Sequence, residues 1–259
     1  MNLTSATEID YLLSTARQAG EAILDVYGTD FEVERKSDRS PLTEADLRAH
    51  RVITERLRER YSDIPILSEE GTEQTPYEVR RSWDRFWLVD PLDGTKEFVK
   101  RNGQFTVNIA LIEDSQPVLG VIYAPVLDHL YHGVVGCGAW KTADGKEAAL
   151  PLSNGAERSG VIIAGSLSHP TPEMDAFIAE QRRAHGKVEF MAMGSSLKIC
   201  LVAEGTADVY PRFGPTMEWD TAAGHAIANA AGRKVMRHNS DEELVYNKPD
   251  LHNDWFIVR

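Results

Sequence analysis

The strongest chemical signal in the sequence is the segment from Asp90 to Thr95 (DPLDGT), which follows a short apolar run at 86–89. Asp, Pro and Gly are common turn residues, so a plain turn is one interpretation. In the other, the end of a strand fixes the backbone and the turn directs Asp90, the Leu92 carbonyl and Asp93 at one point. Clustered carboxylates repel one another unless a cation lies between them. Ligands that are all oxygen favour Mg²⁺, with Mn²⁺ as the second choice.

Three further acidic positions join this motif in the metal hypothesis, and each has a structural alternative. Glu69 follows the apolar pair 66–67, but it belongs to a Glu-Glu-Gly segment that is typical of a solvated loop. Asp46 is the fourth residue of segment 43–46 (TEAD), which is typical of a capping box at the start of a helix. Asp220 opens a predicted helix, where the helix dipole favours any carboxylate. The same helix N-terminus would also suit a phosphate.

Two polar segments with a basic residue interrupt this acidic chain. Segment 194–198 (GSSLK) opens a predicted helix, where backbone N–H groups, Ser195 and Lys198 would suit an anion. Arg212 lies in a loop that is rich in Pro and Gly, and His169 follows a Ser-Leu-Ser run. Taken singly, a helix cap, a surface charge or a structural histidine explains each of these residues more simply.

The two cysteines do not suggest a reactive thiol. Cys137 and Cys200 lie far apart, each within an apolar segment and without metal-ligand spacing. We expect both thiols to be buried and inert, with no disulfide framework, as in proteins of a reducing compartment.

Hydrophobic periodicity predicts the elements that must position these residues. We expect one helix from Ile9 to Tyr27 and a second that begins near Thr43. Short strands are predicted as an antiparallel meander at 86–89, 105–112, 118–123 and 130–135. Beyond residue 150, predicted strands (161–164, 188–191, 207–210, 255–258) alternate with predicted helices (173–183, 195–204, 220–231). This order indicates an α/β fold with an N-terminal α+β half, 1–150, that carries most metal ligands and a C-terminal α/β half, 151–259, that carries Asp220 and the anion contacts.

Composition excludes several classes of function. The 259 residues include 28 Lys and Arg against 40 Asp and Glu, a formal net charge of −12, whereas nucleic-acid binders need a cationic surface. With 42% hydrophobic residues and no low-complexity tract, the chain is predicted to fold. No apolar stretch is long enough to span a bilayer, and no secretory signal opens the sequence. We expect a cytoplasmic protein; peripheral association with the inner membrane and the choice between monomer and homodimer are left open.

Taken together, three motifs resemble the signature of the lithium-sensitive, Mg²⁺-dependent phosphatases of the inositol monophosphatase superfamily. They are the pair Glu69-Glu70, segment 90–95 and segment 219–224 (WDTAAG). The resemblance extends from residue 40 to the last helix. Segments 87–98 (WLVDPLDGTKEF), 101–103, 194–198 with 201–205, and 210–216 resemble the bacterial 3′(2′),5′-bisphosphate nucleotidases of this superfamily. The resemblance implies a layered α/β/α/β/α sandwich of the inositol monophosphatase/fructose-1,6-bisphosphatase type, with the active site between its halves.

The resemblance also implies an activity and a role for each residue. The implied reaction is hydrolysis of the 3′-phosphate of adenosine 3′,5′-bisphosphate to AMP and phosphate, with the sulfated analogue (PAPS to APS) as a second substrate, in sulfate assimilation. Thr95 and Asp46 would orient and deprotonate the attacking water. The implied ligands of two or three Mg²⁺ ions, or of Mn²⁺, are Glu69, Asp90, Leu92 through its carbonyl, Asp93 and Asp220. The implied substrate contacts are Glu69, Leu92, Asp93, Gly94, Thr95, His169, Ser195, Lys198, Arg212 and Asp220.

Two alternatives share these carboxylates. An inositol monophosphatase, or another phosphatase of small phosphate monoesters, would differ in substrate choice. A non-catalytic protein that binds divalent cations would need the carboxylates but not a hydroxyl at Thr95 beside Asp46, because mere binding has no use for a group aimed at a water.

Overall fold

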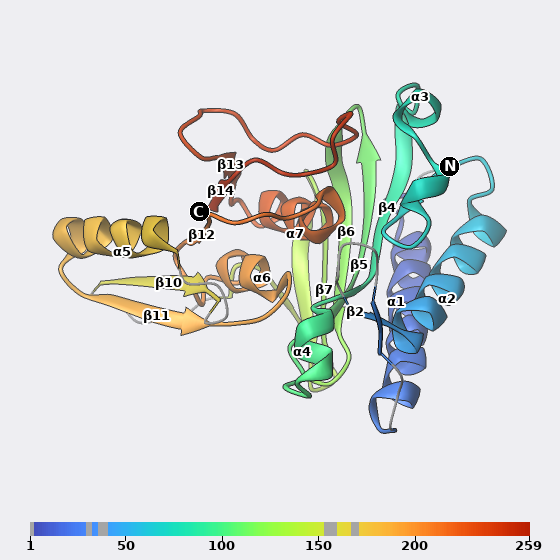
Figure 1. Ribbon diagram of the computed structural model, residues 1–259, viewed down its shortest axis with the longest axis horizontal. Helices are drawn as coiled ribbons and strands as arrows, with labels where there is room; N and C mark the ends of the chain where they lie inside the picture. The colour runs from blue at the N-terminus through green and yellow to red at the C-terminus, as the bar shows by residue number, and fades with distance from the viewer. Residues whose placement is uncertain (1–2, 30–32, 36–40, 153–159, 167–170) are drawn as a thin grey trace.

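The protein is built from five successive layers of helices and sheets, which Figure 1 shows side by side. The computed structural model describes residues 3–29, 33–35, 41–152, 160–166 and 171–259. His169 lies outside the described residues. The first layer pairs helix α1 (Ala6–Tyr27) with helix α2 (Glu44–Arg60), and the short antiparallel strands β1 (Val33–Arg35) and β2 (Pro41–Thr43) precede α2.

The second layer is a sheet of seven strands that follow one another in chain order. They are β3 (Ile66–Ser68), β4 (Arg85–Asp93), β5 (Thr106–Glu113), β6 (Gln116–Ala124), β7 (His129–Val134), β8 (Gly138–Ala143) and β9 (Lys146–Ala149). Strands β3 and β4 are parallel, and every later pair is antiparallel. Three short helical segments lie beside this sheet: η1 (Thr72–Gln74), α3 (Tyr77–Arg80) and α4 (Thr95–Val99).

The remaining layers come from the C-terminal part of the chain. Helices α6 (Leu197–Ala203) and α7 (Glu218–Ala230) cover the other face of the large sheet (Figure 1). Beyond them lie the parallel pair β10 (Val161–Gly165) and β11 (Val188–Ala192), and a small antiparallel sheet of β12 (Tyr210–Arg212), β14 (Phe256–Val258) and β13 (Val235–Arg237). Helix α5 (Pro172–His185) forms the outermost layer.

Two hydrophobic cores fill the faces of the large sheet. Along β4, Phe86 and Leu88 belong to the core beneath α7, whereas Trp87 and Val89 belong to the core beneath α1 and α2. All four side chains are buried, because successive residues of a strand point to opposite faces and helices cover both. This explains why the sequence of β4 is a continuous apolar run that ends at the first acidic residue of the motif.

Helix α7 lies so close to the sheet that glycine is required beneath it. A Cβ atom at Gly120 of β6 would come within 2.2 Å of the carbonyl oxygen of Ala223, and one at Gly133 of β7 within 2.8 Å of the Cα of Ile227. Helix α7 thus shares its core with a sheet from the first half of the sequence. The division into halves at residue 150 stays a prediction.

Most predicted elements are present, but several observed elements were not predicted, among them α3, α4 and β13. The hairpin of β8 and β9 was not predicted, although Asp144-Gly145, both at positive φ, is a recognised hairpin signal. Helix α6 begins at Leu197 rather than at 195, because Ser195 adopts a left-handed conformation. The strand predicted at 207–210 lies at 210–212.

The expectation for the cysteines is half right. Cys200 is buried, and burial raises the pKa of its thiol. Cys137, by contrast, is exposed in the turn between β7 and β8, where its backbone N–H donates to the carbonyl of Val134. A short apolar segment is therefore not buried when it forms the turn of a hairpin.

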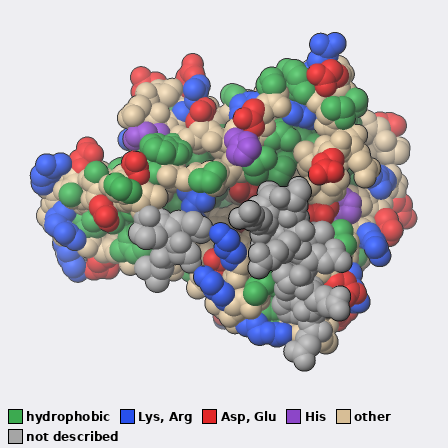
Figure 2. All heavy atoms as spheres, in the orientation of Figure 1, with side chains coloured by type: hydrophobic (Ala, Val, Ile, Leu, Met, Phe, Trp, Pro, Cys, Tyr) green, Lys and Arg blue, Asp and Glu red, His purple; other side chains and the backbone are tan. Residues whose placement is uncertain are grey.

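Charges are spread over the surface. On the face drawn in Figure 2, acidic and basic side chains are interspersed over α5 and the neighbouring C-terminal layer. Within the described parts of the chain, we find no helix long and apolar enough to cross a membrane.

Candidate metal and anion-binding site

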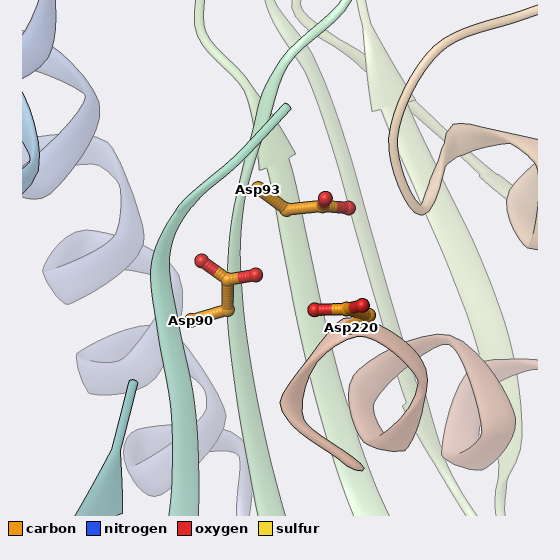
Figure 3. Close-up of side chains that lie close together, drawn as sticks. All are labelled: Asp90, Asp93 and Asp220. Atoms are coloured by element: carbon orange, nitrogen blue, oxygen red, sulfur yellow. The ribbon is translucent and has the colours of Figure 1, made fainter. Parts of the chain in front are cut away.

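Three carboxylates from two distant segments converge at the end of β4. Asp90 and Asp93 come from that strand and Asp220 from the first turn of α7, and Figure 3 shows the three side chains pointing toward one another. One potential ligand oxygen from each lies within 4.8 Å of the others. The sequence predicted all three as metal ligands, and the fold brings them together.

An irregularity in β4 allows two of these carboxylates to share one side. Residues three apart in a regular strand point to opposite faces of a sheet. Here the pairing with β5 shifts between Asp90, which is opposite Asn108, and Asp93, which is opposite Thr106. One extra residue on β4 is a bulge, and it redirects the side chain that follows. The irregular stretch between Asp90 and Asp93 therefore allows both carboxylates to lie on the same side of the strand.

Asp220 caps its own helix and also lies in the acidic cluster. Its carboxylate oxygen Oδ2 accepts a hydrogen bond of 2.9 Å from the backbone N–H of Met217, which caps the start of α7. The same side chain contributes to the acidic cluster. A helix cap and a metal ligand are thus compatible roles, because a carboxylate can accept several hydrogen bonds and still offer an oxygen.

The acidic cluster is costly without a cation. Burial raises the pKa of Asp90 well above its ordinary value, and the negative charges of Glu69, Asp93, Asp220 and Asp46 raise it further. Burial, and next the charge of Asp93, likewise raise the pKa of Asp220. A hard divalent cation would remove this repulsion, and a set of carboxylate oxygens is what Mg²⁺ binds. The residues present therefore fit a Mg²⁺ site.

Glu69 and Asp46 lie at the border of this cluster. The backbone N–H of Glu69 donates to the carbonyl of Val89 at 3.0 Å, which sets Glu69 beside the residue that precedes Asp90. Asp46 is in the first turn of α2 and is fully buried. Its negative charge is close enough to help raise the pKa of Asp90. Three elements, α2, β4 and α7, together with the residue that follows β3, thus supply the acidic groups. The proposed capping role of Asp46 stays a prediction.

The rest of the motif forms the turn from β4 into α4. The backbone N–H of Leu92 donates to the carboxylate of Asp90 at 3.1 Å. Gly94 has a φ of 93°, which suits glycine, and it precedes the first helical residue, Thr95. Thr95 therefore follows directly after the acidic motif in the sequence. The pairing of its hydroxyl with Asp46 stays a prediction.

A cleft continues from Asp93 and Asp220 toward two basic side chains. Its lining includes Gly94, Ser195, Lys198 and Arg212, four of the predicted substrate contacts. Lys198 is buried rather than a surface charge, and its ammonium donates to the carbonyl of Ser195 at 2.5 Å. Burial, together with the charge of Arg212, lowers the pKa of Lys198 to about 8, although the charge of Asp93 acts in the opposite direction. The guanidinium of Arg212 donates to the carbonyl of Pro215 at 2.9 Å.

Sequence reasoning missed a polar group beneath this cleft. Ser196 donates through its backbone N–H to Asp93 Oδ2 at 2.6 Å, and its hydroxyl contacts Thr106 and Asn108 of β5. Thr106 and Asn108 are buried although they stand in an otherwise apolar strand. That pattern, alternate polar residues in a strand with both faces covered, is the signal that could have identified them.

Comparison with known proteins defines the class. Residues 3–254 match the model of the inositol monophosphatase family, and the chain belongs to this family. A solved structure of an IMPase from Thermotoga maritima is 25% identical, with a TM-score of 0.76 over 97% of this chain and 91% of that one.

More similar relatives carry a narrower name. The 3′(2′),5′-bisphosphate nucleotidase CysQ of Salmonella typhimurium is 51% identical over 235 residues, which cover 88% of this chain and 89% of the relative. The protein of the same name from Escherichia coli K12 is 49% identical over the same shares. The crystal structure of CysQ from Bacteroides thetaiotaomicron is 49% identical, with a TM-score of 0.89 over 99% of this chain and 98% of that one. The predicted family and layered fold are confirmed.

Proposed function

We propose that this protein is a Mg²⁺-dependent 3′(2′),5′-bisphosphate nucleotidase that hydrolyses the 3′-phosphate of adenosine 3′,5′-bisphosphate to AMP and phosphate. One observation carries the proposal: Asp93 and Asp220 of the three-carboxylate cluster line the same cleft as two basic side chains, Lys198 and Arg212. A phosphatase of simple monoesters needs only the acidic cluster. In a substrate with a second phosphate, that phosphate would be the partner of the Lys198 and Arg212 side chains. The CysQ relatives are named 3′(2′),5′-bisphosphate nucleotidases, which act on such a substrate.

The acidic residues would hold the metal ions. Asp90, Asp93 and Asp220, with Glu69 and the Leu92 carbonyl, are the proposed ligands for two or three Mg²⁺, with Mn²⁺ as a substitute. When bound, the metal supplies positive charge that activates a water and stabilises the leaving oxygen.

Two side chains of this protein would handle the proton. In the proposed mechanism, the Thr95 hydroxyl orients the attacking water, and a proton of that water passes by way of this hydroxyl to Asp46. The charge of Asp46 is close enough to the cluster to raise the pKa of Asp90. The water oxygen bonds to phosphorus as the bond to the 3′-oxygen breaks, and the 3′-oxygen takes up a proton from solvent to leave as the hydroxyl of AMP. The protein contributes position and charge rather than a covalent intermediate.

The remaining contacts would select the substrate. Arg212 presents two N–H groups to a phosphate, whereas Lys198 acts as a point charge, and together they would bind the 5′-phosphate. Ser195 and Gly94 line the same cleft, and His169 is proposed from the sequence alone. The sulfated analogue, PAPS, would be a second substrate, which suits sulfate assimilation. The proposed location is the cytoplasm, and peripheral attachment to the inner membrane and a homodimer are open to experiment.

A substrate panel tests the proposal. Phosphate release is measured with adenosine 3′,5′-bisphosphate, PAPS, inositol 1-phosphate and a simple aryl phosphate, each with Mg²⁺ and with excess chelator. We expect the bisphosphate nucleotide to have the highest kcat/KM and every activity to require metal. A preference for inositol 1-phosphate would assign the alternative phosphatase activity. Binding of Mg²⁺ without turnover of any substrate would identify a cation-binding protein, and full turnover in chelator would contradict the metal.

A further inference from the structure

A buried polar cluster joins β5 to the start of α6, outside the proposed catalytic residues. At its centre, Thr106 Oγ1 lies 2.5 Å from the hydroxyl of Ser195, 2.8 Å from the hydroxyl of Ser196 and 3.0 Å from Asn108 Oδ1. Thr106 is fully buried and Asn108 is 1% exposed, so no substrate can reach either. Buried hydroxyl networks of this kind fix geometry, because each member has few other partners.

Ser195 links this cluster to both parts of the site. Its hydroxyl lies 2.6 Å from Asp93 Oδ2, and its carbonyl accepts the ammonium hydrogen bond of Lys198 at 2.5 Å. One residue therefore contacts a proposed metal ligand through its side chain and a proposed phosphate-binding cation through its backbone. Any change in the conformation of Ser195 would move both partners.

The conformation of Ser195 is one that a residue with a side chain seldom adopts. Its φ of 54° is in the left-handed region, which is unfavourable for an L-residue with a side chain. Glycine precedes it, and the backbone N–H of Gly194 donates to the Gln104 side chain at 2.8 Å. The turn aims both the Ser195 hydroxyl and the Ser196 N–H at the same oxygen of Asp93. Contacts that hold this turn are therefore needed.

The direction of the hydrogen bonds identifies the residue that acts. An ionised carboxylate only accepts, so the single hydroxyl hydrogen of Ser195 goes to Asp93. The hydrogen of Thr106 lies within reach of two acceptors, Asn108 Oδ1 and the hydroxyl of Ser195. Ser196 also donates to Asn108 Oδ1, at 2.9 Å, so the Thr106 hydrogen can go to Ser195 at 2.5 Å, and the order is then Thr106 to Ser195 to Asp93. Two donors on Oδ2 fix the plane of the Asp93 carboxylate and thereby the direction of its other oxygen.

We propose that Thr106 is a positioning residue, whose buried hydroxyl holds Ser195 in the left-handed turn and so orients both the Asp93 carboxylate toward the metal and Lys198 toward the second phosphate. This inference rests on the proposed function. Thr106 acts through Ser195 and touches neither substrate nor metal.

Valine is nearly the shape of threonine but lacks the hydroxyl, so Thr106→Val is the main test. The midpoint of Mg²⁺ binding is measured by thermal shift of the free protein, and kcat/KM is measured with adenosine 3′,5′-bisphosphate. Thr54→Val is the matched control, because Thr54 is 3% exposed and its hydroxyl donates to the carbonyl of His50, within its own helix. We expect Thr106→Val to raise the Mg²⁺ midpoint about tenfold and to lower kcat/KM by at least as much, from the loss of one charge-assisted chain. Thr54→Val should leave the midpoint unchanged.

Two more variants make the test specific to the hydroxyl chain. Thr106→Ser, which keeps the hydroxyl, should bring the midpoint back to within about threefold of the wild type. Ser195→Ala should shift the midpoint as much as Thr106→Val, and the double variant should shift it no further, because both break the same chain. Ser195 is half-buried, so this variant stands in for Thr106→Val should that protein not fold.

Several results would overturn the inference. They are a folded Thr106→Val protein with the wild-type Mg²⁺ midpoint, a Thr106→Ser protein as impaired as Thr106→Val, and fully additive effects of Thr106→Val and Ser195→Ala. A wild-type protein that binds Mg²⁺ but does not hydrolyse the bisphosphate would contradict the proposed function alone, because the comparison of midpoints would still stand.

Discussion

At the scale of single residues, the contacts of the site converge on Asp93. Its carboxylate accepts hydrogen bonds from Ser195 and from the backbone N–H of Ser196, and its charge raises the pKa of both Asp90 and Asp220. It also opposes the fall in the pKa of Lys198. Asp93 is thus held by neutral donors while it repels two neighbours, which is the arrangement expected of a group that awaits a cation.

The first prediction concerns this repulsion. Asp93→Asn should lower turnover by more than about 100-fold, because a metal ligand is lost. Without metal, the variant should be more stable than the wild type, by on the order of 1 kcal/mol at pH 8, because one like charge is gone while asparagine still accepts both hydrogen bonds. Urea unfolding in chelator measures this difference.

The pH dependence of that gain has a definite sign. The pKa values of Asp90 and Asp220 are raised in the folded protein above their ordinary value of 3.8. Their repulsion therefore costs nothing below that value and grows as the pH rises through the raised pKa values. The stability gained by Asp93→Asn should be larger at pH 8 than at pH 5. A gain that is equal at both pH values would remove like-charge repulsion as its cause.

Lys198 and Arg212 carry the second prediction, which is substrate choice. Lys198→Ala or Arg212→Ala should lower kcat/KM for adenosine 3′,5′-bisphosphate roughly 10- to 150-fold more than for an aryl phosphate, from the loss of one charge-assisted contact. The pKa of Lys198 is about 8, so its charged form is lost as the pH rises above that value. KM for the bisphosphate should then rise between pH 7 and pH 9, and this rise should be absent in Lys198→Ala. Equal losses on both substrates would assign the two residues to the fold or the metal site.

The third prediction separates catalysis from binding at Thr95. Thr95→Ala should lower kcat far more than it raises KM, because the hydroxyl is proposed to act on the water rather than on the nucleotide. Steady-state kinetics with saturating Mg²⁺ measure both constants, and Thr95→Ser is the control that keeps the hydroxyl. A pure effect on KM would move Thr95 out of the catalytic role.

At the scale of elements, the site depends on how closely α7 approaches the large sheet. Asp220 belongs to the first turn of α7, and the helix lies over β6 and β7 at two glycines. Small residues on both elements fix the distance between Asp220 and the two carboxylates of β4. The packing of one helix therefore sets the dimensions of the acidic cluster.

The fourth prediction tests this approach. Gly120→Ala should destabilise the protein by about 1–3 kcal/mol or more, because the added methyl group would overlap the Ala223 carbonyl and push α7 outward. It should also weaken Mg²⁺ binding, because Asp220 moves with the helix. Gly28→Ala is the control, since a Cβ there meets no atom within 4 Å. Urea unfolding and a Mg²⁺ titration follow the two effects; a Gly120→Ala protein as stable as the wild type would contradict the close packing.

At the scale of the whole molecule, the site is assembled from segments on both sides of residue 150. Asp46, Glu69, Asp90 and Asp93 come before it, and Lys198, Arg212 and Asp220 come after it. A cation that binds the carboxylates binds only the folded chain, because the unfolded chain keeps them apart. Metal binding and global stability are therefore linked.

The fifth prediction uses this linkage. Mg²⁺ should raise Tm in a concentration-dependent way, and excess chelator should abolish both this shift and the activity. Millimolar Li⁺ should inhibit turnover by occupying one Mg²⁺ position, as the family resemblance implies. Activity that is insensitive to tens of millimolar Li⁺ would contradict that part of the resemblance.

The sequence by itself determined the acidic motif, the main helices and the family. Local sequence patterns are enough to predict α1, α2 and the strands of the meander, because each helix buries one stripe of its residues and the central strands, covered on both faces, are continuous apolar runs. The motif at 90–95 is contiguous, so its spacing is visible without a fold. The same holds for the capping role of Asp220, since a helix start and its carboxylate are neighbours in the chain.

Only the tertiary structure decided which distant side chains meet. The β4 bulge that turns Asp90 and Asp93 to one side depends on pairing with β5, and no local rule reveals it. The hydroxyl chain from Thr106 to Asp93 joins residues about 90 to 100 positions apart. The burial of Lys198 is likewise a result of tertiary packing. Periodicity reports which face of an element is apolar, but it does not report which polar groups on two covered faces will lie opposite each other. That is fixed by the close packing of helices α6 and α7 on the sheet.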